Sequence, residues 1–358
     1  MSYSAYLYHW PLLAFYRYGW GDVTLLGGCV IFLLTFLLAW LSYKHIETPV
    51  RKMSSKHRVI FVKVFVVPTI LVALLMIAFM KLDGYGLRWF SNDYRDTLQT
   101  IVSSTKPANQ APYVCQSRVV THSDANNDEC VLGLKSSNDV NTILFGDSNA
   151  SHYVGVIGAI AEHQGFAFRN LQNSSCPPID VDAGEYAHPE RVASCNASQR
   201  TIFKALDRYD RIIVSADWTA YQRRSEEFLN VFYSAIEQWT AKGKDVMIVG
   251  KAPVFSGYDR LCREKSISFP GIDCMVTASA ISKDIERVNS ALKAYASEHR
   301  RVDYFDLNDY LCQQALCSIY DEEGEVLYYD SSHISLNGSW QLGRRLVNDG
   351  LIPNFFNR

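Results

Sequence analysis

The stretch that decides the fold is NTILFGDSNASHY, residues 141–153. Its β-branched and apolar run, residues 142–145, is typical of a buried strand. The run stops at Gly146, and Asp147 and Ser148 follow at once. Asp, Ser and Asn are common N-cap residues, so a turn followed by a helix cap explains the pattern. The pattern also fits a nucleophilic serine at a strand-to-helix junction.

Strand-like runs and helix-length segments alternate from this point to the C-terminus. The strand-like runs are residues 142–145, 167–171, 211–215, 245–249 and 302–305, and the helix-length segments are residues 150–163, 198–206, 226–242, 278–299 and 336–347. This alternation predicts an α/β fold with a parallel sheet that is covered on both faces by helices. Active sites in such sheets lie at the carboxyl ends of the strands, which is where Ser148 stands.

The first 80 residues contain two long apolar segments. Residues 23–41 carry no charge and are long enough to span a bilayer, and residues 59–80 carry only Lys63, near the start of the segment. The loop between them is basic and contains Lys44, Arg51, Lys52, Lys56 and Arg58. Such a loop is expected in the cytoplasm, so the residues that follow the second segment are expected on the opposite side of the membrane.

The opening of the chain, residues 2–18, is apolar and aromatic but too short and too polar for a complete span. It is not a signal peptide, because it has no basic n-region and no small-residue cleavage site. It resembles the second half of a membrane helix. We therefore expect the chain to be the C-terminal piece of a larger polytopic protein whose N-terminal membrane helices are missing here.

Cysteine usage points to an oxidising compartment. Cys29 stands alone in an apolar run, and the other eight cysteines fall into four neighbouring pairs. The pairs are Cys115 with Cys130, Cys176 with Cys195, Cys262 with Cys274, and Cys312 with Cys317. An even number of cysteines with short loops favours disulfides, although the pairing is a hypothesis from proximity alone. No cysteine or histidine cluster has zinc-ligand spacing, so we expect no metal site.

Composition and patterning together divide the chain into three parts. Residues 1–81 hold the membrane segments, residues 82–139 form a linker that becomes an ordered extension, and residues 140–358 form the α/β domain. The formal net charge of −2 argues against bulk nucleic-acid binding. The expected surroundings are therefore a lipid bilayer and the compartment outside the cytoplasm.

A base for Ser148 is present near the other end of the chain. A serine is a poor nucleophile unless a base removes its proton. Asp330 and His333 are separated by two residues, so they can share one turn just before the last helix-length segment. The carboxylate can then orient the imidazole while the other ring nitrogen faces the serine. A turn with a capping Asp is the alternative interpretation of this segment.

Phe145-Gly146-Asp147-Ser148 and Asp330-x-x-His333 resemble the first and last sequence blocks of the SGNH (GDSL-type) hydrolases. The resemblance implies a three-layer α/β/α flavodoxin-like fold. It also implies that Ser148 is the nucleophile, His333 the base and Asp330 the residue that orients the base.

The two middle blocks of that family, which supply a Gly and an Asn to the oxyanion hole, are not matched here. We expect the backbone N–H of Ser148 to donate to the oxyanion, and Ser174, Ser175 and the Trp218 indole N–H are further hypotheses. The alternative for Trp218 is a packed core aromatic.

The membrane part resembles a second family. Residues 2–11 (SYSAYLYHWP) and 43–51 (YKHIETPVR) resemble the closing segments of the acyltransferase family 3 membrane domain, and they contain His9 and Glu47. His9 has a plain helix-interior position as its alternative, and Glu47 an ion pair with Lys44 or Arg51.

Members of this family that carry a fused SGNH domain O-acetylate cell-envelope polysaccharides, including the O-antigen of lipopolysaccharide. The resemblance thus implies a bacterial inner-membrane O-acetyltransferase whose SGNH domain lies in the periplasm. It further implies that no cofactor is bound, that acetyl-CoA is the ultimate acetyl donor, and that a polysaccharide is the acceptor. A membrane-anchored carbohydrate esterase or deacetylase is the first alternative, and a non-catalytic polysaccharide-binding module is the second.

Overall fold

The computed structural model describes residues 2–53, 57–81, 92–134, 140–269, 271–274, 281–313 and 316–357. The chain divides into two compact units. The first unit comprises Met1–Thr100 together with Leu261–Cys274, and the second comprises Ile101–Arg260 together with Met275–Arg358.

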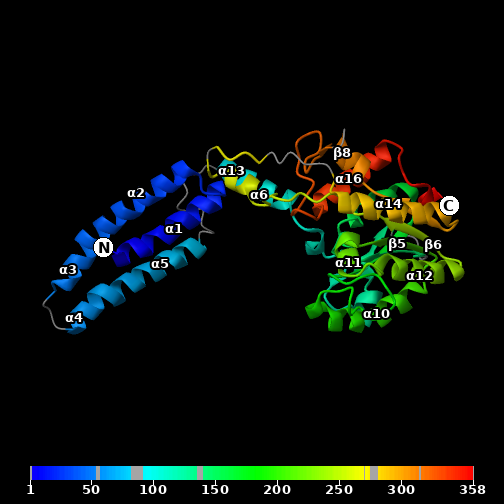
Figure 1. Cartoon of the computed structure of the whole chain (residues 1–358), viewed down its shortest axis with the longest axis horizontal. Coiled ribbons are helices and arrows are strands. Elements are labelled where there is room, and N and C mark those ends of the chain that lie inside the picture. The colour runs from blue at the N-terminus through cyan, green and yellow to red at the C-terminus, as the bar shows by residue number, and fades with distance from the viewer. Residues whose placement is uncertain are drawn as a thin grey trace. The chain divides into compact units, whose positions relative to one another are not determined.

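The first unit is helical. Its elements are α1 (Ser2–Trp20), α2 (Leu25–Ser42), the π-helical turn η1 (Tyr43–Glu47), α3 (Thr48–Arg51), α4 (His57–Phe61), the π-helical turn η2 (Val62–Val66), α5 (Val67–Lys81) and α13 (Cys262–Ser266). Helix α6 (Asn92–Ser104) begins in this unit and ends in the second. Figure 1 shows α1, α2 and α5 as long rods.

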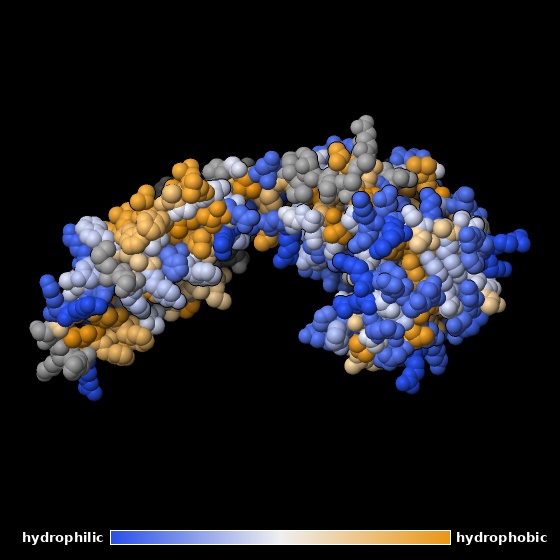
Figure 2. Space-filling model, viewed as in Figure 1, coloured by the Kyte–Doolittle hydropathy of each residue, from blue (hydrophilic) through white to orange (hydrophobic). Residues whose placement is uncertain are grey.

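Two helical stretches of the first unit, Leu25–Arg51 and Arg58–Ala78, are long and apolar enough to cross a membrane. The second stretch matches the predicted span of residues 59–80 closely. The first covers most of the predicted span of residues 23–41 and continues to Arg51, into the segment predicted to be a loop. Only 17% and 0% of their most apolar windows is buried, so these helices do not form the core of a soluble domain. Their hydrophobic side chains face outward instead (Figure 2), as expected of helices that are covered by lipid.

The segment Leu261–Cys274 packs within the first unit although about 160 residues separate it in sequence from the rest of that unit. The Phe269 ring lies edge-on to Trp20 and Tyr18, with centroids 5.3 and 6.3 Å away. The Lys265 ammonium lies 4.5 Å from the Tyr18 ring centroid. The Cys262–Cys274 disulfide closes this segment.

The second unit is built on a mostly parallel sheet. The long strands are β3 (Thr142–Gly146), β4 (Ala167–Asn173), β5 (Arg211–Ser215), β6 (Asp245–Val249) and β7 (Val302–Phe305), in the spatial order β4-β3-β5-β6-β7. Two short strands, β1 (Gln116–Ser117) and β2 (Val131–Gly133), pair with β4, parallel and antiparallel respectively. Counted among the long strands the order is 2-1-3-4-5, which is flavodoxin-like and has its switch point between β3 and β5.

Helices cover both faces of this sheet (Figure 1). On one face Leu144 and Ile213 pack against α9 (Val154–Gln164) and α16 (Leu336–Asn348). On the other face Phe145 and Val214 pack against α10 (Val192–Leu206), α12 (Phe228–Ala241) and α14 (Lys283–Glu298). The predicted three-layer α/β/α architecture is therefore confirmed.

The remaining elements of the second unit are short. They are η4 (Ala108–Gln110), α7 (His122–Asn126), η5 (Asp128–Cys130), α8 (Ser148–Ser151), η6 (Pro189–Arg191), α11 (Trp218–Arg224), α15 (Asn308–Leu311), β8 (Cys312–Gln313), β9 (Leu316–Cys317) and η7 (Asn354–Asn357). All four predicted disulfides are present, and Cys29 is a free, exposed cysteine.

Candidate active site

Ser148 is the first residue of α8 and follows β3 after the single residue Asp147. Gly146 has φ +143°, and a Cβ atom there would lie 1.8 Å from the carbonyl oxygen of Ser215 on the neighbouring strand. Only glycine fits this close approach. The Asp147 side chain accepts the N–H of Asn149 at 2.7 Å and caps α8, which begins with Ser148. The cap and the glycine together place the serine at the carboxyl end of the central strand.

The structure brings Ser148, His333 and Asp330 together. Ser148 Oγ lies 2.9 Å from Nε2 of His333, and Nδ1 of His333 lies 2.9 Å from Oδ2 of Asp330. Because a carboxylate can only accept, His333 carries its proton on Nδ1, and its Nε2 is then free to accept the serine proton. Such an array can activate a serine for nucleophilic attack.

The Asp330 carboxylate is fixed by its own turn. Its Oδ1 accepts the backbone N–H groups of Ser332 and His333, both at 2.8 Å. Partial burial acts to raise the pKa of Asp330, but the hydrogen bond and charge of His333 and these two N–H bonds outweigh burial and hold the pKa well below its ordinary value. Asp330 is therefore an anion at neutral pH and can stabilise a positive charge on His333.

A buried polar network lies behind the nucleophile. Oδ2 of Asp147 accepts the N–H of Asp217 at 2.9 Å and the hydroxyl of Tyr221 at 2.7 Å. Lys251, 2% exposed, donates to Oδ1 of Asn149 and lies 3.4 Å from Oδ2 of Asp217. Burial and then the charge of Asp217 raise the pKa of Asp147. The network joins the carboxyl ends of β3, β5 and β6, so it sets the backbone that carries Ser148.

A pocket of about 140 Å³ opens at Ser148. It is lined by Pro107, Ala108, Asn109, Gln116, Ser148, Ser151, His152, Tyr329, Asp330, His333 and Ile334. The first four come from the segment that the sequence predicted to be a linker and extension. That segment packs against the loop carrying the base, since the N–H of Leu336 donates to the carbonyl oxygen of Lys106.

Two of the predicted oxyanion donors lie outside this lining. The hydroxyl of Ser174 accepts from Nε2 of Gln116 at 2.9 Å, and its N–H donates to the carbonyl oxygen of Ser117. Ser175 is exposed and adopts a left-handed conformation with φ 54°. Neither residue lines the pocket, so their role stays a hypothesis. In contrast, the N–H of Ser148, at the open start of α8, has no hydrogen-bond partner among the described residues.

The prediction that Trp218 donates to the oxyanion is wrong. Its indole N–H donates to the carbonyl oxygen of Val249 at 2.8 Å, and the side chain is 0% exposed. The ring packs against Phe232, with a centroid distance of 4.6 Å. Trp218 is the packed core aromatic that the sequence offered as the alternative, because its single donor is already used.

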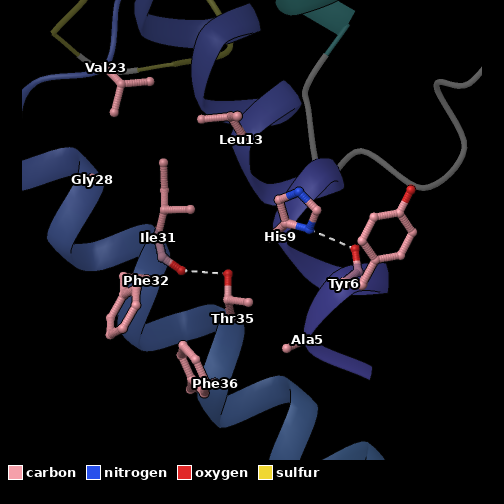
Figure 3. A pocket seen from close by; sticks show the side chains of 10 residues that line it. All are labelled: Ala5, Tyr6, His9, Leu13, Val23, Gly28, Ile31, Phe32, Thr35 and Phe36. Atoms are coloured by element: carbon pink, nitrogen blue, oxygen red, sulfur yellow. Dashed lines mark hydrogen bonds between the residues drawn. The ribbon is translucent and has the colours of Figure 1, made fainter. Parts of the chain in front are cut away.

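His9 and Glu47 lie in the first unit and make separate contacts. His9 lines a pocket of about 430 Å³ between α1 and α2 (Figure 3), and its Nδ1–H donates to the carbonyl oxygen of Tyr6 at 2.7 Å. Glu47 accepts from the Ser4 hydroxyl at 3.0 Å and pairs with Arg51 at 2.5 Å. The alternative of an ion pair with Arg51 is therefore observed. No hydrogen bond joins His9 to Glu47 among the residues described.

Sequence reasoning missed several residues of the pocket. Gln116 follows Cys115 directly, and the Cys115–Cys130 bridge was the one available signal that this segment is ordered. His152 follows Ser148 by four residues and gave no signal, because its contacts are with Ile334, far away in the sequence. Across the described ranges, no group of three or more His, Cys, Asp or Glu side chains is placed to hold a metal ion.

Comparisons with known proteins bear on the family and on the fold of this domain. A family model described as "SGNH domain (fused to AT3 domains)" matches residues 115–348. The periplasmic domain of a lipopolysaccharide acetyltransferase from Salmonella ser. Paratyphi A has a similar structure, with a TM-score of 0.50, 15% identity, and coverage of 72% of this chain and 97% of that one.

A Streptococcus pneumonia protein, provisionally named a platelet activating factor, matches with a TM-score of 0.37, 16% identity, and coverage of 61% of this chain and 86% of that one. No curated protein matches the chain. At 15% identity the Salmonella structure shows a likeness of fold alone.

Proposed function

Because the chain belongs to the family of SGNH domains that are fused to AT3 domains, we propose that it is an O-acetyltransferase that modifies sugar hydroxyls of an envelope polysaccharide. The observation that carries the proposal is the 2.9 Å contact between Ser148 Oγ and His333 Nε2, with Asp330 behind the imidazole. An SGNH domain supports acyl transfer or ester hydrolysis in general, and the membrane helices favour transfer.

The first half-reaction forms an acetyl-serine. Ser148 Oγ attacks the carbonyl carbon of the acetyl donor while Nε2 of His333 takes the hydroxyl proton. The imidazolium, balanced by Asp330, then returns that proton to the leaving group as its bond to the carbonyl carbon breaks. The free N–H of Ser148 is the proposed donor to the oxyanion that forms on the carbonyl oxygen.

The second half-reaction transfers the acetyl group. Nε2 of His333 takes the proton of a sugar hydroxyl, whose oxygen attacks the acetyl-serine. Ser148 leaves and recovers the proton from the imidazolium. Hydrolysis is the same sequence with water in place of the sugar, so the acceptor that reaches the pocket decides between transferase and esterase.

The substrates are also part of the proposal. The similar Salmonella protein is named a lipopolysaccharide acetyltransferase, which favours an O-antigen sugar as acceptor. Acetyl-CoA in the cytoplasm is the proposed ultimate donor, with further membrane helices upstream carrying the acetyl group across the inner membrane. The SGNH domain would then work in the periplasm, which agrees with its disulfides.

The test is the acetylation of the envelope glycan in cells that carry the full-length protein. Wild type should add O-acetyl groups that NMR detects on the isolated glycan, and Ser148→Ala should add none at equal protein level. Acetylation by Ser148→Ala would overturn the proposal. Fewer acetyl groups with the wild type than with Ser148→Ala would identify the deacetylase instead.

A further inference from the structure

His152 is a buried histidine beside the proposed base. It follows α8 directly, is 1% exposed, and lines the same pocket as Ser148. Its ring centroid lies 5.9 Å from that of His333, at an interplanar angle of 72°. The two half-reactions above give this side chain no role.

One hydrogen bond fixes the tautomer of His152. The backbone N–H of Ile334 donates to Nδ1 of His152 at 3.3 Å. Since an amide N–H can only donate, Nδ1 must be unprotonated, and the proton of the neutral ring is on Nε2. A doubly protonated ring would place an N–H against the N–H of Ile334.

The surroundings also disfavour a charged His152. Burial is the main cause that holds the pKa of His152 well below its ordinary value, and the positive charges of His333 and Lys251 add to it. Asp330 is the opposing charge. A neutral neighbour matters here, because His333 must become positively charged in each half-reaction and a second cation would oppose that.

We propose that His152 is a positioning residue for His333: it ties the loop of the base to the helix of the nucleophile and packs its neutral ring against the imidazole. The hydrogen bond between Ile334 and His152 lies close to both reacting residues. Ile334 adjoins His333, and His152 follows Ser148 by one helical turn. The inference rests on the proposed function, in which Ser148 and His333 must stay within hydrogen-bond reach although 185 residues separate them.

A histidine that merely fills the core does not explain these contacts. Nε2 of His152 is buried and has no hydrogen-bond partner among the described residues. Burial of an unpaired donor is unfavourable, so an apolar ring would pack better at this position if packing were its only task. What an apolar ring lacks is the acceptor for the N–H of Ile334.

Three substitutions separate the acceptor from the ring. In His152→Asn the side-chain oxygen can occupy the place of Nδ1 and keep the bond to Ile334. In His152→Gln the amide extends to the place of Nε2 and that bond is lost. In His152→Phe an aromatic ring remains without an acceptor. The assay is hydrolysis of 4-nitrophenyl acetate by the full chain in detergent, with kcat, KM and melting temperature measured for each variant and for Ser148→Ala.

The expected result is a loss of about 100-fold in kcat for His152→Phe with KM unchanged, the size that a misplaced reacting group can cause. His152→Asn should recover most of that loss, whereas His152→Gln should not. If His152→Phe does not fold, the comparison of kcat between His152→Asn and His152→Gln tests the role of the acceptor.

The possible contrary results bear on two different claims. Equal kcat values for Asn and Gln, or a wild-type kcat for Phe, would overturn the role of His152 while an inactive Ser148→Ala leaves the proposed function intact. An active Ser148→Ala would overturn the proposed function itself.

Discussion

Ser148 and His333 lie 185 residues apart in the sequence and form a hydrogen bond. Side chains that accept hydrogen bonds from the backbone of short turns fix their positions. Asp147 caps the helix that starts at Ser148, and Asp330 accepts two N–H groups of its own turn. The sequence predicted Ser148, His333 and Asp330 because their residue types and spacing match a known chemistry. Beyond the N–H of Ser148, it could not predict the donors of the oxyanion hole, because every residue type except proline carries a backbone N–H.

Replacement of Asp330 by Asn should lower kcat by about 1,000-fold or more, because an amide stabilises neither the imidazolium nor the required tautomer. The pKa of Asp330 is held low, so the wild-type carboxylate is ionised at every pH near neutrality. The charge of Asp330 therefore does not change between about pH 6 and 8, and a large loss in kcat should be present throughout that range. The measurement is kcat against pH for ester hydrolysis.

The effect of Asp330→Asn on the free energy of unfolding should depend on pH in a definite direction. A carboxyl group with a depressed pKa stabilises the folded protein above its ordinary pKa of about 4, and this contribution fades as the pH falls below that value. The stability difference between wild type and Asp330→Asn should therefore shrink on acidification. A difference that grows toward low pH would contradict this account of Asp330.

Trp218→Phe should lower stability and leave turnover unchanged. The substitution leaves the carbonyl oxygen of Val249 without the indole donor, which is expected to cost about 1–3 kcal/mol in the free energy of unfolding. Trp239→Phe is the matched control, because Trp239 is buried in the same core and its indole has no hydrogen bond among the described residues. Urea unfolding measures the stability of both variants, and ester hydrolysis measures their kcat. A specific fall in kcat for Trp218→Phe would restore Trp218 to the mechanism.

At the scale of helices and strands, apolar runs with β-branched residues were sufficient to locate the long strands. The predicted bounds of β5, β6 and β7 match the structure, and those of β3 and β4 end one and two residues early. The sequence did not reveal β1, β2 and α11. The two strands have only two and three residues, too few for a pattern, and they pair with β4 beside the Cys115–Cys130 bridge. The seven residues of α11 are too few to establish a helical period.

Lys251→Met should weaken the network that joins β3, β5 and β6. Removal of one partner of a buried ion pair typically costs about 3–5 kcal/mol, and the part exposure of Asp217 makes the lower end the expectation here. Because Asn149 also loses its donor, the turn at Ser148 should move, and kcat should fall by about 10-fold or more. Unfolding and ester hydrolysis are the measurements.

The pH dependence of this variant follows from Asp217. Burial acts to raise the pKa of Asp217, but Lys251 and neighbouring hydrogen bonds outweigh burial and leave the pKa lowered. The Asp217 carboxylate thus stabilises the fold above its ordinary pKa, and the gap between wild type and Lys251→Met should narrow as the pH falls below about 4. Lys244→Met is the control. Lys244 is a buried lysine that donates to the carbonyl oxygens of Asp207 and Tyr209, so its replacement should lower the free energy of unfolding without lowering kcat. An equal loss of kcat in both variants would contradict the role of the network.

Removal of the Cys115–Cys130 disulfide should loosen one wall of the pocket. The bridge closes a loop of 15 residues, for which chain entropy predicts about 3 kcal/mol of stabilisation. Since Gln116 adjoins the bridge, KM for a glycan acceptor should rise in the double Cys→Ala variant. The Cys312–Cys317 bridge spans 5 residues, so its removal should cost less, about 2 kcal/mol, and leave KM unchanged. Equal effects on KM would mean that the wall at Gln116 does not contact the acceptor.

At the scale of the whole molecule, two independent features give the same orientation. The basic residues between the apolar helices favour the cytoplasm for that loop. The four disulfides favour an oxidising compartment for the SGNH domain. Helix α5 lies between the basic loop and the SGNH domain in the sequence. A single crossing of the membrane at this helix therefore places the loop and the domain on opposite sides, as both features require. The proposed chemistry needs this separation, since acetyl-CoA and the glycan would lie on opposite sides of the membrane.

Thiol labelling in intact cells tests this orientation. In a Cys29→Ser background, Lys52→Cys places a thiol in the basic loop, and Ser297→Cys places one on the exposed surface of α14. A membrane-impermeant maleimide should label Ser297→Cys in spheroplasts, and it should label Lys52→Cys only after the membrane is permeabilised. Glycan acetylation by each variant confirms that the labelled protein is folded. Labelling of Lys52→Cys in intact spheroplasts would reverse the topology, and the SGNH domain would then lie in the cytoplasm with no route to a periplasmic glycan.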